Sequence, residues 1–295
     1  MERRPAFCRN RAANEPETTM QRNASWTKWW DLTRILTARN LKIRYKGSVL
    51  GFFWSLLTPA LTILMYAVFA HILKFNKGQP HYLQFLVSGI IVWGFTAGAL
   101  NDSLFAIAGN ANLVKKVYFP RAILPLTTAL ANGVNFLLTF VPLVLYLALT
   151  GTLEVGPGLL WLLPAFAFHL ALCAGIACLA GTLNVFFRDT QHIVGVGQLA
   201  WFFLTPVFYF PRMQLESAGF LGAWKGLVFL NPMTGVLALY RRGLMGAAEQ
   251  PLVPPDFAAE VPAWWAGVSC AVCLAVLFLG LAALRRGDRS FGDAL

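Results

Sequence analysis

The chain has 295 residues, of which 57% are hydrophobic and only 13% are charged. Soluble domains carry about 25% charged residues, so this composition excludes an ordinary soluble domain and favours a polytopic helical membrane protein. The net charge of +11 does not indicate a nucleic-acid-binding protein, because eleven of the 24 Lys and Arg residues precede Gly47 and most of the others end apolar runs. That distribution is typical of orientation in an anionic membrane, so we expect a membrane and no nucleic acid as partner.

The first 48 residues contain no apolar run long enough to cross a membrane. Residues 1–25 are polar, lack the apolar core of a secretory signal and predict a disordered cytoplasmic tail. Residues 26–48 predict an amphipathic interface helix lying on the membrane, because tryptophans and cations recur there at three- and four-residue steps. The expected apolar face consists of Trp26, Trp29, Trp30, Thr33 and Leu36.

Six apolar segments are long enough to cross a bilayer core of about 30 Å. They predict an all-α transmembrane domain over 49–284, in which Pro59 kinks the first span. Gly94 and Gly98 in the second span have the spacing that lets two helices approach closely. The six expected spans are about 50–73, 82–107, 122–149, 159–183, 193–210 and 264–284.

A different element is predicted between the fifth and sixth spans. Two short apolar pieces, 220–230 and 235–245, are separated there by Asn231 and Pro232. Each piece is too short to cross, and apolar runs of about 10–14 residues are more often re-entrant or interfacial. We therefore expect a re-entrant helical hairpin over about 218–246.

The positions of the cations orient this domain. With six spans and the N-terminus inside, 18 of the 24 Lys and Arg residues lie on the cytoplasmic side and six lie outside. Counting the hairpin region as one full span moves Arg285, Arg286 and Arg289 outside, which is the poorer assignment. We therefore expect both termini in the cytoplasm, with 285–295 as a short cytoplasmic tail.

No sequence motif supports catalysis by this chain. It contains no G-x-x-x-x-G-K-[ST] phosphate loop, no H-E-x-x-H and no G-x-S-x-G. Cys270 and Cys273 form a C-x-x-C inside an apolar run with no second pair, so we expect small lipid-buried residues rather than a metal or redox site. We expect a non-enzymatic chain that holds no metal and no cofactor.

Polar groups in or beside the predicted spans are the functional candidates. Asp102 and His169 lie in the second and fourth spans. For both we favour a structural role over contact with substrate, with Asp102 bonded to a neighbouring helix or a nearby cation. A basic cluster before the first span fits two interpretations: it binds anionic lipid headgroups, or it binds the pyrophosphate of a lipid-linked substrate. Its members are Arg39, Lys42, Arg44 and Lys46.

Aromatic residues make up 14% of the chain. Anchoring in lipid and at the membrane interface explains most of them. The dense run 201–210 also fits a sugar-conducting channel, because the apolar faces of sugars stack on aromatic rings without hydrogen bonds that would trap them. Both interpretations stay open, and the candidate lining residues are Trp54, Trp201, Phe202, Phe208 and Tyr209.

Five motifs occur in order along the chain. They are Arg44-Tyr45-Lys46-Gly47-Ser48-Val49-Leu50-Gly51 with Trp54 and Pro59, Val117-Tyr118-Phe119-Pro120-Arg121 with Leu124-Pro125, Phe187-Arg188-Asp189, Pro206-Val207 before Tyr209, and Leu230-Asn231-Pro232-Met233-Thr234 with Tyr240-Arg241. Together they resemble type-2 ABC transporter permeases that export polysaccharides such as O-antigen, capsule and teichoic acid. The resemblance covers about 26–286 and is closer to the O-antigen and teichoic acid branch.

The resemblance implies a homodimer with six spans per protomer, paired with two copies of a separate ATPase in the bacterial inner membrane. Spans one and five would form the channel at the dimer interface, and the hairpin would line its outer exit. The substrate would be a polysaccharide carried on an undecaprenyl-type pyrophosphate lipid. The interface helix and the loop 110–121 would contact the ATPase, and the implied coupling residues are Lys115, Lys116, Tyr118, Arg121, Arg188 and Asp189.

Two other functions stay open. A type-2 ABC exporter of drugs or small lipids would have a narrow apolar cavity with polar contacts for a small molecule and no aromatic-lined channel. An integral membrane glycosyl- or acyltransferase would need acidic or His groups clustered at one face. The acidic residues expected outside are scattered, so we rank that function lowest; they are Glu154, Glu216, Glu249, Asp256 and Glu260.

Overall fold

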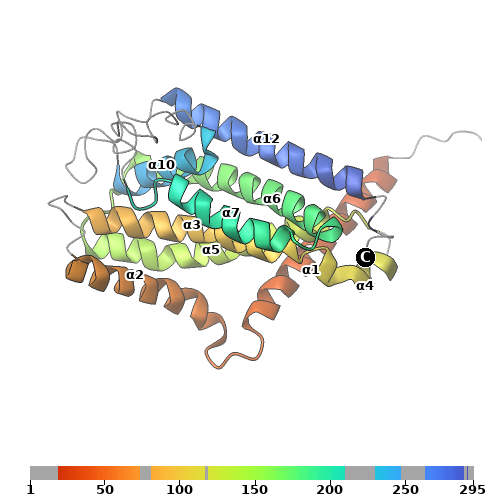
Figure 1. Ribbon diagram of the computed structural model, residues 1–295, viewed down its shortest axis with the longest axis horizontal. Helices are drawn as coiled ribbons and strands as arrows, with labels where there is room; N and C mark the ends of the chain where they lie inside the picture. Colours follow the sequence, from red (N-terminus) through yellow and green to blue (C-terminus); the bar gives the residue numbers. More distant parts are fainter. Residues whose placement is uncertain are drawn as a thin grey trace, which may run out of the picture.

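The computed structural model describes residues 19–73, 81–116, 119–209, 230–246, 263–288 and 291, and within these ranges it contains helices and turns but no strand (Figure 1). Three short 3-10 turns, at Gly51–Phe53, Ala108–Asn110 and Pro157–Trp161, precede helices. The helices are α1 (Thr19–Tyr45), α2 (Trp54–Leu73), α3 (Tyr82–Leu104), α4 (Ala111–Lys116), α5 (Ile123–Leu149), α6 (Leu162–Phe186), α7 (Thr190–Leu204), α10 (Pro232–Met245) and α12 (Ala263–Gly287).

Among the described residues, four helices are long and apolar enough to cross a membrane, which fits an all-helical polytopic membrane protein. They are α3, α5, α6 with its leading turn, and α12 from Gly267, and they match the second, third, fourth and sixth predicted spans. The first and fifth predicted spans correspond to α2, whose apolar part covers Trp54–Phe69, and to α7, which has 15 residues. Because a perpendicular crossing needs roughly 20 residues, the count of six spans stays a prediction.

Helix α1 differs in its bounds and its packed face from the predicted interface helix. It begins at Thr19 rather than at 26 and ends at Tyr45, while residues 1–18 of the predicted tail lie outside the described part. Its packed side carries Trp29, Leu32 and the buried Leu36, whereas Trp30 is 70% exposed. Neighbouring helix positions are about 100° apart, so Trp29 and Trp30 cannot share one narrow face.

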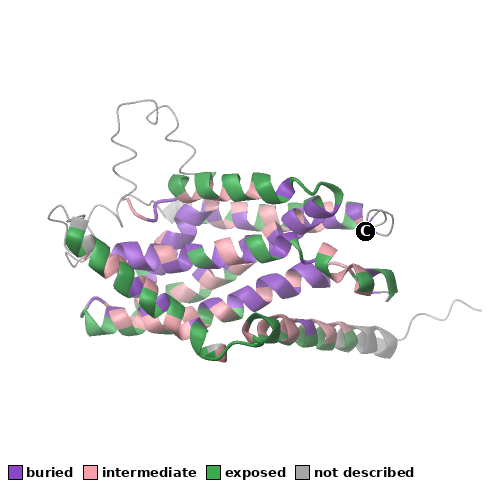
Figure 2. Cartoon of the chain, turned by 60° about the horizontal axis from the view of Figure 1, so that its bottom comes forward, coloured by how far each residue is buried: buried purple, intermediate pink, exposed green. Residues whose placement is uncertain are grey.

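Two hydrophobic clusters form most of the core of the described residues. The larger one is built around α3 and joins α5, α6 and α10, and the buried residues follow these inner helices in Figure 2. The smaller one lies where α1, α4 and the end of α12 meet, at the opposite end of the bundle from α10 (Figure 1). The central position of α3 explains why 67% of its apolar window is buried, against 22% for α12.

Helix α10 is the second half of the predicted re-entrant hairpin. The side chain of Asn231 caps it, because its Oδ1 accepts a hydrogen bond from the backbone N–H of Met233 at 3.1 Å, and Pro232 occupies the first helical position. Most of its side chains are buried against α6 and α12. Residues 210–229 lie outside the described part, so the hairpin itself stays a prediction.

The close helix contact expected at Gly94 and Gly98 occurs elsewhere. An added Cβ at Gly94 would meet nothing within 4 Å, and one at Gly98 would meet only the Asn132 side chain. Helices α6 and α12 cross instead at Gly175 and Gly280, where a Cβ would lie 2.6 Å and 2.2 Å from the facing backbone. Gly94 therefore faces open space, whereas Gly98 lets α3 approach the Asn132 side chain of α5 closely.

Candidate substrate-binding cavity

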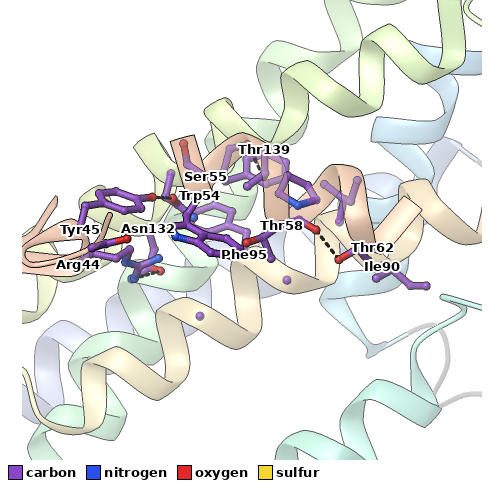
Figure 3. Close-up of a pocket in the computed structure, with 17 residues that line it drawn as sticks. Arg44, Tyr45, Trp54, Ser55, Thr58, Thr62, Ile90, Phe95, Asn132 and Thr139 are labelled. Atoms are coloured by element: carbon purple, nitrogen blue, oxygen red, sulfur yellow. Dashed lines mark hydrogen bonds between the residues drawn. The ribbon is translucent and has the colours of Figure 1, made fainter. Parts of the chain in front are cut away.

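A cavity of about 490 Å³ lies between the end of α1, α2, α3 and α5 (Figure 3). Its volume is in the range of small-molecule sites in proteins, about 300–1,000 Å³. Arg44 and Tyr45 stand at one end, and the cavity extends along α2 as far as Thr62. The cavity is therefore formed within a single chain, by residues of α2, α3, α5 and the end of α1.

Two polar stripes line this cavity. Positions three, four and seven apart share a helix face, so Ser55, Thr58 and Thr62 line up along α2. On α5 the same spacing brings Asn132, Asn135 and Thr139 to the cavity. The third wall is α3, with Ile90, Ile91, Gly94, Phe95 and Gly98.

The polar stripes suit an uncharged ligand rich in hydroxyl groups. The hydroxyls of Thr62 and Thr139 each donate to a carbonyl oxygen of their own helix, Thr58 and Phe136, at 2.8 Å. A hydroxyl oxygen that donates its proton can still accept, and an amide offers both a donor and an acceptor. The stripes thus present a mixed set of hydrogen-bonding groups beside the apolar wall of α3.

Arg44 is fixed at the mouth of the cavity by a network with α3 and α5. Its Nη2 forms a salt bridge with Asp102 Oδ2 and donates to Asn132 Oδ1 at 2.9 Å. Asn132 Nδ2 in turn donates to Asp102 Oδ2 at 2.9 Å and to the carbonyl oxygen of Thr128 at 3.0 Å. The prediction that Asp102 bonds to a neighbouring helix or a nearby cation is confirmed.

The network is only partly shielded from solvent. The side chains of Arg44 and Asp102 are 32% and 44% exposed. A half-exposed ion pair contributes about 0–1 kcal/mol, so its partners can be exchanged at small cost. Beside it, the hydroxyl of Tyr45 donates to Asn135 Oδ1 and fixes the end of α1 to α5.

The rest of the basic cluster is divided. Arg39 donates from Nη2 to Asn110 Oδ1 at 2.7 Å, on the turn before α4, so it lies away from the cavity. Lys42 and Lys46 are exposed on either side of Arg44. Among the four predicted basic residues, Arg44 alone lines the cavity.

The predicted channel aromatics also fall in two places. Trp54 lines the cavity, whereas Trp201 and Phe202 pack against Trp93 of α3, with ring centroids 5.4 Å and 5.5 Å from it. Phe208 lies 5.8 Å from Phe202 and 5.2 Å from Tyr209. Trp201 also donates to Asn231 Oδ1 at 2.9 Å, which ties α7 to the cap of α10.

The predicted coupling residues gather near one end of the bundle. Lys115 and Lys116 are exposed at the end of α4, and Arg188 and Asp189 are exposed between α6 and α7, near the same end (Figure 1). Arg121 is different, because it forms an ion pair with Asp288 near the C-terminus. Tyr118 lies outside the described residues.

Two buried polar side chains mark the opposite end. His169 is fully buried and its Nε2 lies 2.8 Å from Thr96 Oγ1, in agreement with a structural role. Arg241 is 1% exposed and donates to the carbonyl oxygens of Phe85, Pro206 and Val207 at 2.9–3.1 Å. The count of cations places Arg241 outside the membrane, and its burial within the fold does not test that side. The sequence did not predict the burial, and the only local signal for it was the place of Arg241 beside the apolar run 235–240.

These features define a helical membrane protein with a polar cavity in the membrane domain. Among the residues that the structure describes, no three His, Cys, Asp or Glu side chains are grouped so that they could hold a metal ion. The chain belongs to the ABC-2 type transporter family, whose model matches residues 31–245. This match confirms the resemblance seen in the motifs.

Individual relatives point to polysaccharide export. The chain is 32% identical over 219 residues to an O-antigen export system permease protein of Klebsiella pneumoniae, covering 73% of this chain and 81% of the relative. It is 32% identical over 211 residues to one of Myxococcus xanthus, covering 70% and 77%. The polysialic acid transport protein of Escherichia coli is 22% identical over 264 residues, covering 86% and 93%.

The family fixes the general class of activity and location. Its members are transport permease subunits rather than catalytic enzymes, and membership implies an ABC ATPase partner. Together with the apolar helices, it indicates a multi-pass protein of the inner membrane.

Proposed function

We propose that this chain is the transmembrane subunit of an ATP-driven exporter that moves a polysaccharide attached to undecaprenyl pyrophosphate across the inner membrane. The names of the relatives support an O-antigen-like or teichoic-acid-like glycan as cargo. The cavity between α2, α3 and α5 supports a site for the lipid-proximal part of that molecule.

The observation that carries this proposal is the position of Arg44. A guanidinium pairs well with phosphate oxygens, because it offers several N–H donors in one plane. Arg44 stands at the mouth of a cavity whose walls beyond it are hydroxyls, amides and aromatic rings. We infer that the pyrophosphate binds at Arg44 and the first sugars extend along the polar stripes.

Lys42 and Lys46 have a secondary role in this proposal. Both are exposed on the chain segment that carries Arg44, and each cation near an anionic surface contributes about 1 kcal/mol of attraction. They raise the local concentration of the anionic lipid substrate. Arg39 instead fixes the turn before α4 through Asn110.

The translocation path is proposed to form between two copies of the chain. Helices α2 and α7 both expose apolar residues to their surroundings, among them Leu64, Phe69, Val196 and Phe203. In this homodimer the cluster of Trp201, Phe202, Phe208 and Tyr209 lies beside the path, and Trp54 connects the path to the cavity.

Energy comes from two copies of a partner ATPase that bind ATP and Mg²⁺. They dock on the cytoplasmic side, where both termini lie in this proposal. Exposed Lys115, Lys116, Arg188 and Asp189 at that end, with Tyr118, form the docking surface. A drug or small-lipid exporter is less well supported, because the relatives at 32% identity are O-antigen export permeases.

The proposal is tested with paired charge removals on α1 and the segment after it. Arg44→Ala with Lys46→Ala should lower surface glycan by about tenfold or more, because transport loses its phosphate contact. The matched control is Lys28→Ala with Arg34→Ala, which removes the same charge from exposed positions of α1. Membrane insertion is checked by the amount of protein in the membrane fraction, and unchanged export in the Arg44 variant would refute the pyrophosphate site.

A further inference from the structure

Asp288 and Phe291, which follow the end of α12, lie against Arg121. Arg121 Nε lies 3.4 Å from Asp288 Oδ1, and its Nη1 donates to the backbone carbonyl oxygen of Asp288. The guanidinium also lies 5.8 Å from the centroid of the Phe291 ring. One side chain therefore makes an ion pair, a hydrogen bond and a cation–π contact with the same short segment.

Phe291 is the anchor of this contact. It is fully buried at 0% exposure, and its ring lies 5.6 Å from that of Phe186 at the end of α6. It belongs to the smaller hydrophobic core, whose other members include Leu36 of α1, Val114 of α4 and Phe119. Because burying a large apolar side chain is favourable, Phe291 holds this segment against the core.

Gly287 makes the close approach feasible. A Cβ at this position would lie 3.1 Å from ring atoms of both Phe186 and Phe291, tighter than most real Cβ contacts. The end of α12 thus has room for Phe291 only because residue 287 has no side chain. Gly287, Asp288 and Phe291 therefore all contribute to one contact with Arg121 and Phe186.

We propose that Gly287, Asp288 and Phe291 form a C-terminal clasp that joins the loop 110–121 to the end of α12, so that motion imposed on this loop by the partner ATPase reaches the last membrane helix. This inference rests on the proposed function. It changes the role of Arg121 from an ATPase contact to a positioning residue. Residues of α1, α4, α6 and α12 pack together at the clasp, so a displacement of α4 would move these helices together.

The clasp is tested in the full complex with its ATPase in proteoliposomes, with ATP hydrolysis and glycan export measured on the same sample. Phe291→Ala should lower export by about tenfold while hydrolysis stays within about twofold of wild type, since the clasp transmits motion and does not bind nucleotide. Phe291→Leu, which keeps an apolar side chain, should restore most of the export. Arg286→Ala, an exposed guanidinium on the same helix, is the matched control and should export normally.

Arg121→Ala should have the same phenotype, and the double variant Arg121→Ala with Phe291→Ala should be no worse than the stronger single one, because both break one contact. Wild-type export by Phe291→Ala would overturn the inference, as would equal losses of hydrolysis and export or additive effects of the two substitutions.

A structural readout separates the clasp from the proposed cargo. Spin labels at Asn112→Cys and Arg286→Cys, with all five native cysteines replaced, report the distance between α4 and α12 with and without a non-hydrolysable ATP analogue. In the wild-type complex the distribution of this distance should be narrow and unchanged by the analogue. In Phe291→Ala the distribution should broaden. A narrow distance distribution in both proteins would refute the clasp, whether or not glycan is transported. A wild-type complex that keeps the narrow distribution but exports no glycan would instead refute the proposed cargo.

Discussion

Arg44 and Arg241 contact opposite ends of α3 and have very different surroundings. Arg44 is 32% exposed at its side chain and is paired with the carboxylate of Asp102, near the end of α3. Arg241 is 1% exposed, donates to three backbone carbonyl oxygens and stacks on Phe85 near the start of α3, 3.4 Å from the ring centroid. We call the surroundings of Arg44 the open site. The buried contact of Arg241 with Phe85, Pro206 and Val207 is called the closed joint.

The difference lies in what each guanidinium would lose on moving. A half-exposed ion pair is worth about 0–1 kcal/mol, so an anionic ligand can take the place of Asp102. A buried carbonyl that loses its donor costs about 1–3 kcal/mol, and Arg241 satisfies three of them. The region around Arg44 can therefore respond to substrate, whereas the region around Arg241 fixes the end of α7 against α3 and α10.

Removing the closed joint gives the first test. Arg241→Ala should lower the free energy of unfolding by about 3–4 kcal/mol, because buried carbonyl oxygens lose their donors and a cavity is left. The neighbouring Arg242 is exposed and only lies over Trp161, at 4.8 Å, so Arg242→Ala should cost less than about 1 kcal/mol. Thermal unfolding of the two variants in nanodiscs measures the contrast, and equal stabilities would mean that Arg241 does not hold the joint.

Two glycines of α3 extend the same comparison. A Cβ at Gly89 would lie 2.6 Å from Arg241 Nη2 and 2.8 Å from the carbonyl oxygen of Val207, while one at Gly94 would meet nothing within 4 Å. Gly89→Ala should therefore destabilise by about 1–3 kcal/mol through overpacking. Gly94→Ala should leave stability unchanged but lower export, since its methyl group enters the cavity. If both variants were equally stable, the packing described around Arg241 would be wrong.

The parts of the fold that sequence predicts well are those set by local rules. Apolar runs of about 20 residues located the four long spans, because a bilayer demands that length. Asn231 and Pro232 marked the start of α10, since an Asn cap followed by Pro at the first helical position is a local signal. These features need no knowledge of the neighbouring helices.

The parts that sequence did not predict depend on contacts between distant segments. Arg241 reaches carbonyl oxygens up to 156 positions away, and Arg121 reaches Asp288, 167 positions away. The cavity had a visible signal that was missed, because the stripe on α2 and the stripe on α5 both repeat at three- and four-residue steps. Nothing in the sequence says that the two stripes face each other, and only the packing of α2 and α5 brings them together.

Asp102→Asn tests the open site with a small change in shape. Stability should change by less than about 1 kcal/mol, because the pair with Arg44 is half-exposed. The variant removes the carboxylate that competes with pyrophosphate for Arg44, so the lipid-linked substrate should reach half-maximal stimulation of ATP hydrolysis at about a threefold lower concentration. Glu154→Gln, which neutralises an exposed carboxylate in the turn after α5, away from the proposed docking surface, is the matched control and should leave that concentration unchanged. A higher concentration in Asp102→Asn would show instead that the ion pair holds Arg44 in the orientation that binds substrate, and the exchange of partners inferred from the half-exposed pair would be wrong.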